Sequence, residues 1–130
     1  MKILVGYDRS KASENALNHA LQHAQAFNAE VHVMTSLEQG AALKKEDIDK
    51  AENQLEKIRK PFKAAGIQCE IRTSVSYQSP GEDMVRYARE NDIGQIIVGV
   101  RRRSKVGKLV TGSTAQYVIL NASCPVLSVK

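Results

Sequence analysis

Tryptophan is absent from this sequence, and aromatic residues make up only 5% of its 130 residues. Proteins that bind single-stranded nucleic acid usually stack the bases on aromatic side chains that alternate with basic ones. The chain has too few aromatic residues for such a surface. We therefore do not expect nucleic-acid binding to be its main function.

Cysteine is also scarce. The two cysteines, Cys69 and Cys124, lie far apart in the sequence. Neither belongs to a C-x-x-C motif or to a Cys/His cluster, which are the usual spacings of zinc ligands. We expect both to be buried, reduced thiols, as in proteins of a reducing compartment.

Long apolar segments are lacking too. No run approaches the about 20 residues that a membrane-spanning helix needs. Met1 and Lys2 lead into only three apolar residues, Ile3–Val5, which is too short for the apolar region of a signal peptide. We expect a cytoplasmic protein without membrane association. The length and the hydrophobic content of 42% fit one globular domain that spans residues 1–130.

Positive charge is concentrated in one segment. The chain has 19 basic and 14 acidic residues, and five of the basic ones lie in Gly99–Thr114, which contains no acidic residue. These five are Arg101, Arg102, Arg103, Lys105 and Lys108. A basic, glycine-bounded loop that leads into a helix is typical of an anion site, because unpaired N–H groups and the helix dipole favour negative charge there. The alternatives are a solvated charged loop or a surface for acidic protein or nucleic acid.

Short apolar runs alternate with amphipathic stretches along the whole chain. Strands are expected at Lys2–Tyr7, Glu30–Thr35, Gln68–Val75, Gln95–Val98 and Pro125–Val129. Four helices are expected between these strands, the second of them at Lys44–Ala65, and Ser36–Leu43 is expected to be a loop. This order predicts a single-domain, doubly wound α/β fold, with a mostly parallel sheet and helices on both faces. Alternating apolar and polar residues in Gln68–Val75 indicate an edge strand.

Serine residues mark the expected helix starts. Ser10 can cap the first helix, and Ser79-Pro80-Gly81-Glu82 combines a cap with a proline in the first turn. Ser113, with Gln116 three residues later, predicts a capping box at the last helix.

Polar and glycine residues follow two of the expected strands. Asp8 and Ser10 follow the first strand, and Gly99 follows the fourth. Ligands of doubly wound sheets bind at the carboxyl ends of the strands, where the strand order reverses. If these two strands are neighbours at the reversal, Asp8, Ser10, Gly99 and Gly112–Thr114 converge on one crevice. The sequence contains neither a Walker A motif nor a G-x-G-x-x-G motif.

The histidines do not indicate a catalytic or metal site. His19 and His23 are four residues apart on the first expected helix, but no third metal ligand is apparent. We expect both to be solvated and His32, in the second strand, to be structural. No Ser/His/Asp or Cys/His pairing can be inferred, so a catalytic function is not indicated.

The sequence resembles the universal stress protein family along nearly its whole length. The resemblance rests on Ile3–Ser10 and on the final segment Gly99–Val129, in which the helix start at Gly112-Ser113 and the closing Ala122–Val129 are particularly characteristic. The nucleotide-binding branch of that family has the pattern Gly, two residues, Gly, nine residues, Gly, then Ser or Thr. Gly99, Gly112 and Ser113 match this pattern, whereas Arg102 stands in place of the middle glycine. Arginine brings a side chain where backbone would approach the phosphates, but it is also a bidentate phosphate donor.

The resemblance implies a Rossmann-like five-stranded parallel sheet of order 3-2-1-4-5, with the first and fourth strands adjacent. It also implies a site for ATP or another adenine nucleotide, with Asp8 at the adenine or ribose and the backbone near Ser36 at the base. Gly99 would lie at the ribose. Gly112, Ser113 and Thr114 would lie at the phosphates, next to Arg101 and Arg102, and Mg²⁺ could bridge phosphate oxygens.

Three functions follow as hypotheses. The first is a stress-response protein that binds ATP and senses or signals, and that forms a homodimer through the last strand, Pro125–Val129. The second is an interaction module whose basic loop binds acidic protein or nucleic acid. The third is a slow ATP hydrolase, although no residue is typical of a committed general base.

Overall fold

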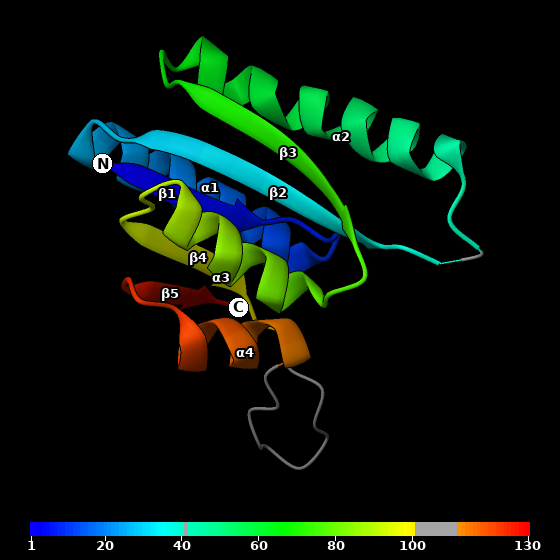
Figure 1. Ribbon diagram of the computed structural model, residues 1–130. Helices are drawn as coiled ribbons and strands as arrows, with labels where there is room; N and C mark the ends of the chain where they lie inside the picture. The colour runs from blue at the N-terminus through cyan, green and yellow to red at the C-terminus, as the bar shows by residue number, and fades with distance from the viewer. Residues whose placement is uncertain (41, 101–111) are drawn as a thin grey trace.

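A five-stranded parallel sheet forms the centre of the computed structural model of the protein (Figure 1). The structure describes residues 1–40, 42–100 and 112–130. The elements are β1 (Lys2–Gly6), α1 (Lys11–Phe27), β2 (Glu30–Glu38), α2 (Lys45–Ala64), β3 (Cys69–Ser76), α3 (Pro80–Glu90), β4 (Gln95–Gly99), α4 (Ser113–Asn121) and β5 (Val126–Val129). The strand order is β3-β2-β1-β4-β5, as the family resemblance implies.

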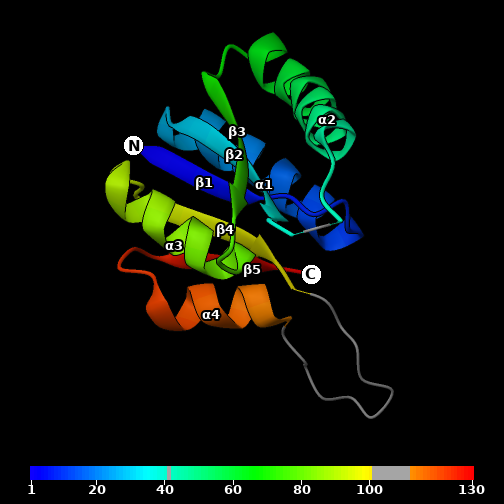
Figure 2. The ribbon, with the colours of Figure 1, turned by 45° about the vertical axis from the view of Figure 1, so that its right-hand side comes forward.

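The pattern of burial explains why helices cover both faces of this sheet. In β1, Ile3 and Val5 point toward α1 and α2, whereas Leu4 points toward α3 and α4, and all three are fully buried. A strand that is apolar on both sides must be covered on both sides. Figure 1 shows α3 and α4 in front of the sheet and α1 behind it, and Figure 2 shows the same layers after rotation.

β1 and β4, the two strands expected to lie beside a ligand site, are neighbours in the sheet. β1 pairs with β4 through Ile3–Gln95, Leu4–Ile96 and Val5–Ile97, and with β2 on its other side. The chain therefore leaves β1 and β4 in opposite directions, which opens a crevice between the two connections. β3 lies at one edge of the sheet, as the alternating pattern predicts.

Two local predictions are wrong. Ser36 lies in a strand and not in a loop, because β2 continues in register with β3 through Ser36–Ser74 as far as Glu38. Ser113 does not form a capping box with Gln116, because Gly112 is the N-cap residue and Ser113 is already in the first helical turn. Among the residues that the structure describes, no side chain caps α4.

Candidate functional site

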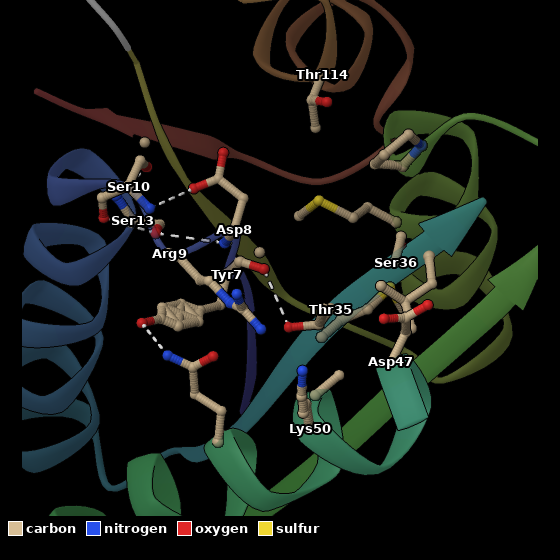
Figure 3. Close-up of a pocket in the computed structure, with 18 of the residues that line it drawn as sticks. Tyr7, Asp8, Arg9, Ser10, Ser13, Thr35, Ser36, Asp47, Lys50 and Thr114 are labelled. Atoms are coloured by element: carbon tan, nitrogen blue, oxygen red, sulfur yellow. Dashed lines mark hydrogen bonds between the residues drawn. The ribbon is translucent and has the colours of Figure 1, made fainter. Parts of the chain in front are cut away.

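A pocket of about 680 Å³ lies at the carboxyl ends of β1, β2 and β4 (Figure 3). Its walls come from the loop after β1, the end of β2, the first turns of α2, and the starts of α3 and α4. The lining residues are Gly6, Tyr7, Asp8, Arg9, Ser10, Ser13, Met34, Thr35, Ser36, Leu37, Ala42, Leu43, Asp47, Lys50, Ala51, Gln54, Pro80, Met84, Val98, Gly99 and Thr114. A concave site with an apolar interior and a few converging polar groups is the usual form of a small-molecule site.

Hydrogen bonds fix the conformation of the loop after β1. The Ser10 amide donates to Asp8 Oδ1 at 2.9 Å, and Ser10 Oγ accepts from the Ser13 amide at 3.1 Å as the N-cap of α1. The Ser13 hydroxyl donates to the Ser10 carbonyl at 2.9 Å, and Thr35 Oγ1 donates to the Tyr7 carbonyl at 3.0 Å. These local hydrogen bonds hold the pocket wall formed by Asp8 and Ser10 in one conformation without a ligand.

Gly99 brings β4 into direct contact with the first turn of α1. A Cβ atom at this position would lie 2.7 Å from both the Ala12 carbonyl carbon and the Ser13 nitrogen. Any side chain here would collide with backbone, so the close approach of strand and helix at the pocket requires glycine. Gly112 differs, because a Cβ there would meet nothing within 4 Å.

The start of α4 brings Thr114 to the pocket. Figure 3 shows the Thr114 side chain at the end of the pocket opposite Lys50. The first N–H groups of this helix have no partner within the helix and carry partial positive charge. Gly112 is half-buried and Ser113 is exposed just before Thr114, so the segment Gly112–Thr114 lies at the pocket rim.

The sequence-predicted residues therefore fall into two groups. Asp8, Ser10, Ser36, Gly99 and Thr114 line one pocket, with Gly112 and Ser113 adjacent to Thr114. Arg101 and Arg102 lie outside the described residues. The binding roles assigned to all of these residues remain predictions.

Several pocket residues escaped the sequence analysis. Arg9 follows Asp8, and Asp47, Lys50 and Gln54 face the pocket from α2. Nothing in the charge pattern of α2 separates Lys50 from its solvated neighbours. The spacing of Lys50 and Gln54, four residues apart and hence on one helix face, becomes informative only once β2 and α2 are placed.

Tyr7 links the loop after β1 to α2. Its hydroxyl accepts a hydrogen bond from Gln54 Nε2 at 3.2 Å. Burial raises the pKa of the Tyr7 phenol, nearby Glu14 adds to the rise, and the Arg9 charge opposes both. The phenol therefore stays neutral, and its hydrogen bond to Gln54 joins the two walls of the pocket.

Residues 1–40, 42–100 and 112–130 hold no group of three or more His, Cys, Asp or Glu side chains that could bind a metal ion. Both histidines of the predicted solvated pair lie on α1, where His19 is exposed and His23 Nδ1 lies 3.2 Å from Gln95 Oε1. His32 is buried, with its ring nitrogens 2.7 Å from the Tyr87 hydroxyl and 2.6 Å from Glu30 Oε1, which confirms a structural role. Cys69 and Cys124 are both free thiols, but only Cys69 is buried, and Cys124 is half-buried, so the expectation of burial is wrong for Cys124.

No helix in the described part of the chain has the length and apolar character that crossing a bilayer requires.

Comparisons with known proteins agree with this geometry. The sequence model of the Universal stress protein family matches residues 1–130. A solved universal stress protein from Archaeoglobus fulgidus is 36% identical, with a TM-score of 0.88 and coverage of 100% of this chain and 98% of that one. A universal stress protein from the same organism, solved in complex with dAMP, is 32% identical, with a TM-score of 0.83 and the same coverage. A universal stress protein of Methanocaldococcus jannaschii is 29% identical, over 99% of this chain and 81% of its own length. The chain belongs to the universal stress protein family.

Proposed function

We propose that this protein is a cytoplasmic stress-response protein that binds an adenine nucleotide, ATP in particular, and uses it to sense or to signal. One observation carries the proposal. The hydrogen-bonded loop after β1 and the close approach of Gly99 to α1 form a preorganised polar pocket where the strand order reverses. The Archaeoglobus fulgidus relative solved with dAMP supports this assignment.

Each end of the pocket suits one part of a nucleotide. Asp8 offers a carboxylate to the ribose hydroxyls, and Ser36, at the end of β2, offers backbone groups to the base beside apolar Leu37 and Leu43. The backbone of Gly99 lines the part of the pocket that we assign to the ribose. The N–H groups of Ser113 and Thr114 at the start of α4 suit the phosphates, as does the charge of Arg101 and Arg102.

In this proposal a magnesium ion binds mainly to the phosphates of the nucleotide and not to a set of several protein ligands. The described residues hold no cluster of three or more carboxylate, His or Cys side chains. Mg²⁺ commonly keeps several waters and binds one or two carboxylates together with substrate phosphates. Two carboxylates line the pocket, Asp8 and Asp47, and we assign Asp8 to such an ion or its waters.

A homodimer through β5 belongs to the same proposal. Among the described strands, β5 lies at the edge of the sheet and pairs with β4 alone, and Ile119 and Leu120 of the neighbouring α4 are 45% and 73% exposed. An unpaired edge beside exposed apolar side chains favours pairing with a second copy.

Equilibrium dialysis against ATP, ADP and AMP, with and without Mg²⁺, tests the proposal. We expect saturable binding well below millimolar ligand. Asp8→Asn should weaken it about tenfold, since a hydrogen bond to a charged group contributes about 1.5–3 kcal/mol. Asp49→Asn, the same change at an exposed position of α2 outside the pocket, should have no effect. No binding below millimolar concentrations would refute the proposal.

A further inference from the structure

A pair of histidines lies on α1, outside the pocket. His19 is exposed and His23 is half-buried, and neither lines the pocket. The two are four residues apart, and residues with this spacing are neighbours on the surface of a helix. Their rings contact each other edge to face, with centroids 6.4 Å apart and planes at 85°. The fold therefore holds two imidazole groups together on a surface that the proposed function does not use.

Contacts on two sides fix the orientation of the His23 ring. Its Nδ1 lies 3.2 Å from Oε1 of Gln95, at the start of β4. An amide oxygen only accepts, so Nδ1 carries the proton and Nε2 has the free lone pair. Phe27, one turn further along α1, packs edge to face against the same ring, with centroids 5.6 Å apart. Metal-binding histidines are typically held in this way, by an oxygen that accepts from one ring nitrogen and leaves the other for the metal.

The second imidazole, of His19, is mobile enough to complete the pair. Apart from its ring contact with His23, it makes no hydrogen bond or ion pair with residues 1–40, 42–100 or 112–130. An exposed side chain without such bonds changes rotamer freely. Rotation of His19 therefore brings a ring nitrogen toward His23 Nε2, while Gln95 and Phe27 hold the His23 ring in place.

The charges of α1 do not oppose a cation at the histidine pair. Lys11 and Glu14 are the only Lys, Arg, Asp or Glu residues of this helix, and they pair with each other in its first turn at 3.8 Å. The exposed neighbours of the histidines on α1, Asn18 and Gln22, are neutral amides. No lysine or arginine of α1 thus lies within one turn of either imidazole.

The number of protein ligands decides which metal suits the pair. Among the described residues, no third His, Cys, Asp or Glu joins the two imidazoles. Zinc sites of proteins usually have three or four protein ligands, so two are too few for a typical zinc site. A tetragonal set of nitrogen and oxygen ligands is typical of Cu²⁺ and Ni²⁺, and two imidazoles with water supply such a set.

We propose that His19 and His23 bind a divalent transition-metal ion of the Cu²⁺ and Ni²⁺ class, with Gln95 as a positioning residue and water in the remaining coordination positions. This site goes beyond the proposed function and needs no nucleotide. It also differs from the magnesium ion of that proposal, because Mg²⁺ prefers oxygen ligands and would not bind two imidazoles.

Calorimetric titration of the untagged protein with Ni²⁺, without nucleotide, tests the inference. Ni²⁺ is the probe because, unlike Cu²⁺, it does not oxidise the free thiols of the chain. We expect one Ni²⁺ per chain. His19→Gln and His23→Gln should each weaken binding by about tenfold or more, since the second imidazole no longer binds intramolecularly. Gln95→Leu should weaken it about tenfold, whereas Gln95→Glu keeps the acceptor and should bind at least as tightly as the parent.

A variant with the same number of histidines is the matched control. Asn18→His combined with His19→Asn, both at exposed positions, places the two imidazoles five residues apart and off one helix face. This variant should lose the Ni²⁺ affinity, and Ni²⁺ should raise the melting temperature of the parent but not of the variant.

Each result bears on the site alone and leaves the nucleotide proposal unaffected. If the parent does not bind Ni²⁺, or if the variant with shifted spacing binds it equally well, the histidine pair is not a metal site. If Gln95→Leu binds as tightly as the parent, Gln95 does not position His23, and that part of the inference is wrong.

Discussion

Gly99 and Gly112 both belong to the glycine pattern of the sequence, but their surroundings differ. The Cα of Gly99 faces the backbone of the first turn of α1, and a Cβ would approach it to 2.7 Å. The Cα of Gly112 faces open space, and its φ of −60° suits any residue. The sequence pattern treats the two positions alike, whereas packing constrains only Gly99.

This difference predicts unequal effects of alanine. Gly99→Ala should lower the free energy of unfolding by about 2 kcal/mol, because α1 and β4 must separate to accept the methyl group. Gly112→Ala is the matched control and should change it by less than about 0.5 kcal/mol. Urea unfolding of both variants measures this. Equal effects would show that Gly99 does not contact α1 closely.

Cys69 provides a residue-scale test of burial. Burial raises the pKa of its thiol to about 11, with Arg59 opposing the shift. The folded protein holds this proton more tightly than the unfolded chain does, so its contribution to stability is complete below about pH 9 and is lost as the pH rises toward 11. We expect the free energy of unfolding to fall more steeply between pH 9 and 11 in the parent than in Cys69→Ala. Parallel curves would contradict this, because the two proteins differ only at residue 69.

At the scale of the elements, the N-cap predicted for α3 is correct and the one predicted for α4 is wrong. Ser79 Oγ accepts from the Glu82 amide at 3.3 Å and so caps α3. Ser113 was predicted to act in the same way, but α4 begins one residue earlier, at a glycine cap. A serine followed three residues later by glutamine fits two registers, and the sequence alone does not distinguish them.

The two serines give a direct comparison. Ser79→Ala should cost about 1 kcal/mol of stability, the usual value of a lost N-cap. Ser113→Ala should cost less than about 0.5 kcal/mol, because this side chain makes no cap bond and alanine is accepted in the first turn. Thermal unfolding of both variants compares them. A larger loss at Ser113 than at Ser79 would restore the predicted capping box.

The sequence is sufficient for the order of elements, because buried strands such as Ile3–Val5 differ clearly from amphipathic helices. The strand order and the adjacency of β1 and β4 came from the family resemblance, since periodicity carries no information on which strands pair. The expected end of β2 is too early because Ser36 and Glu38 are polar, and pairing with β3 extends the strand over Ser36–Glu38. The sequence does not indicate Arg9 and Lys50 as pocket residues, because they come to line one pocket only when α2 packs over the end of β2.

At the scale of the whole molecule, the outer edge of β5 is where we propose that two copies of the chain pair. The Ile96 amide donates to the Pro125 carbonyl and the Val100 amide donates to the Val129 carbonyl, so residues 125, 127 and 129 face β4. The N–H groups of Val126 and Ser128 therefore point outward. Ser128→Pro removes an outward donor without breaking the pairing with β4.

We expect Ser128→Pro to convert a dimer into a monomer of unchanged fold. Light scattering coupled to size-exclusion chromatography measures the mass, and circular dichroism checks the fold. Ser128→Ala is the control and should stay dimeric, because it keeps the backbone donor. A parent protein that is monomeric at all concentrations would contradict the proposed assembly.

The central claim is that the pocket at the ends of β1, β2 and β4 binds an adenine nucleotide. The most direct measurement is a titration of the ¹⁵N-labelled protein with ATP and Mg²⁺, followed by amide NMR. The account predicts saturable shifts, below millimolar ligand, that centre on Asp8–Ser10, Ser36, Gly99 and Thr114. Shifts confined to surfaces outside this pocket, or none below millimolar ligand, would contradict it.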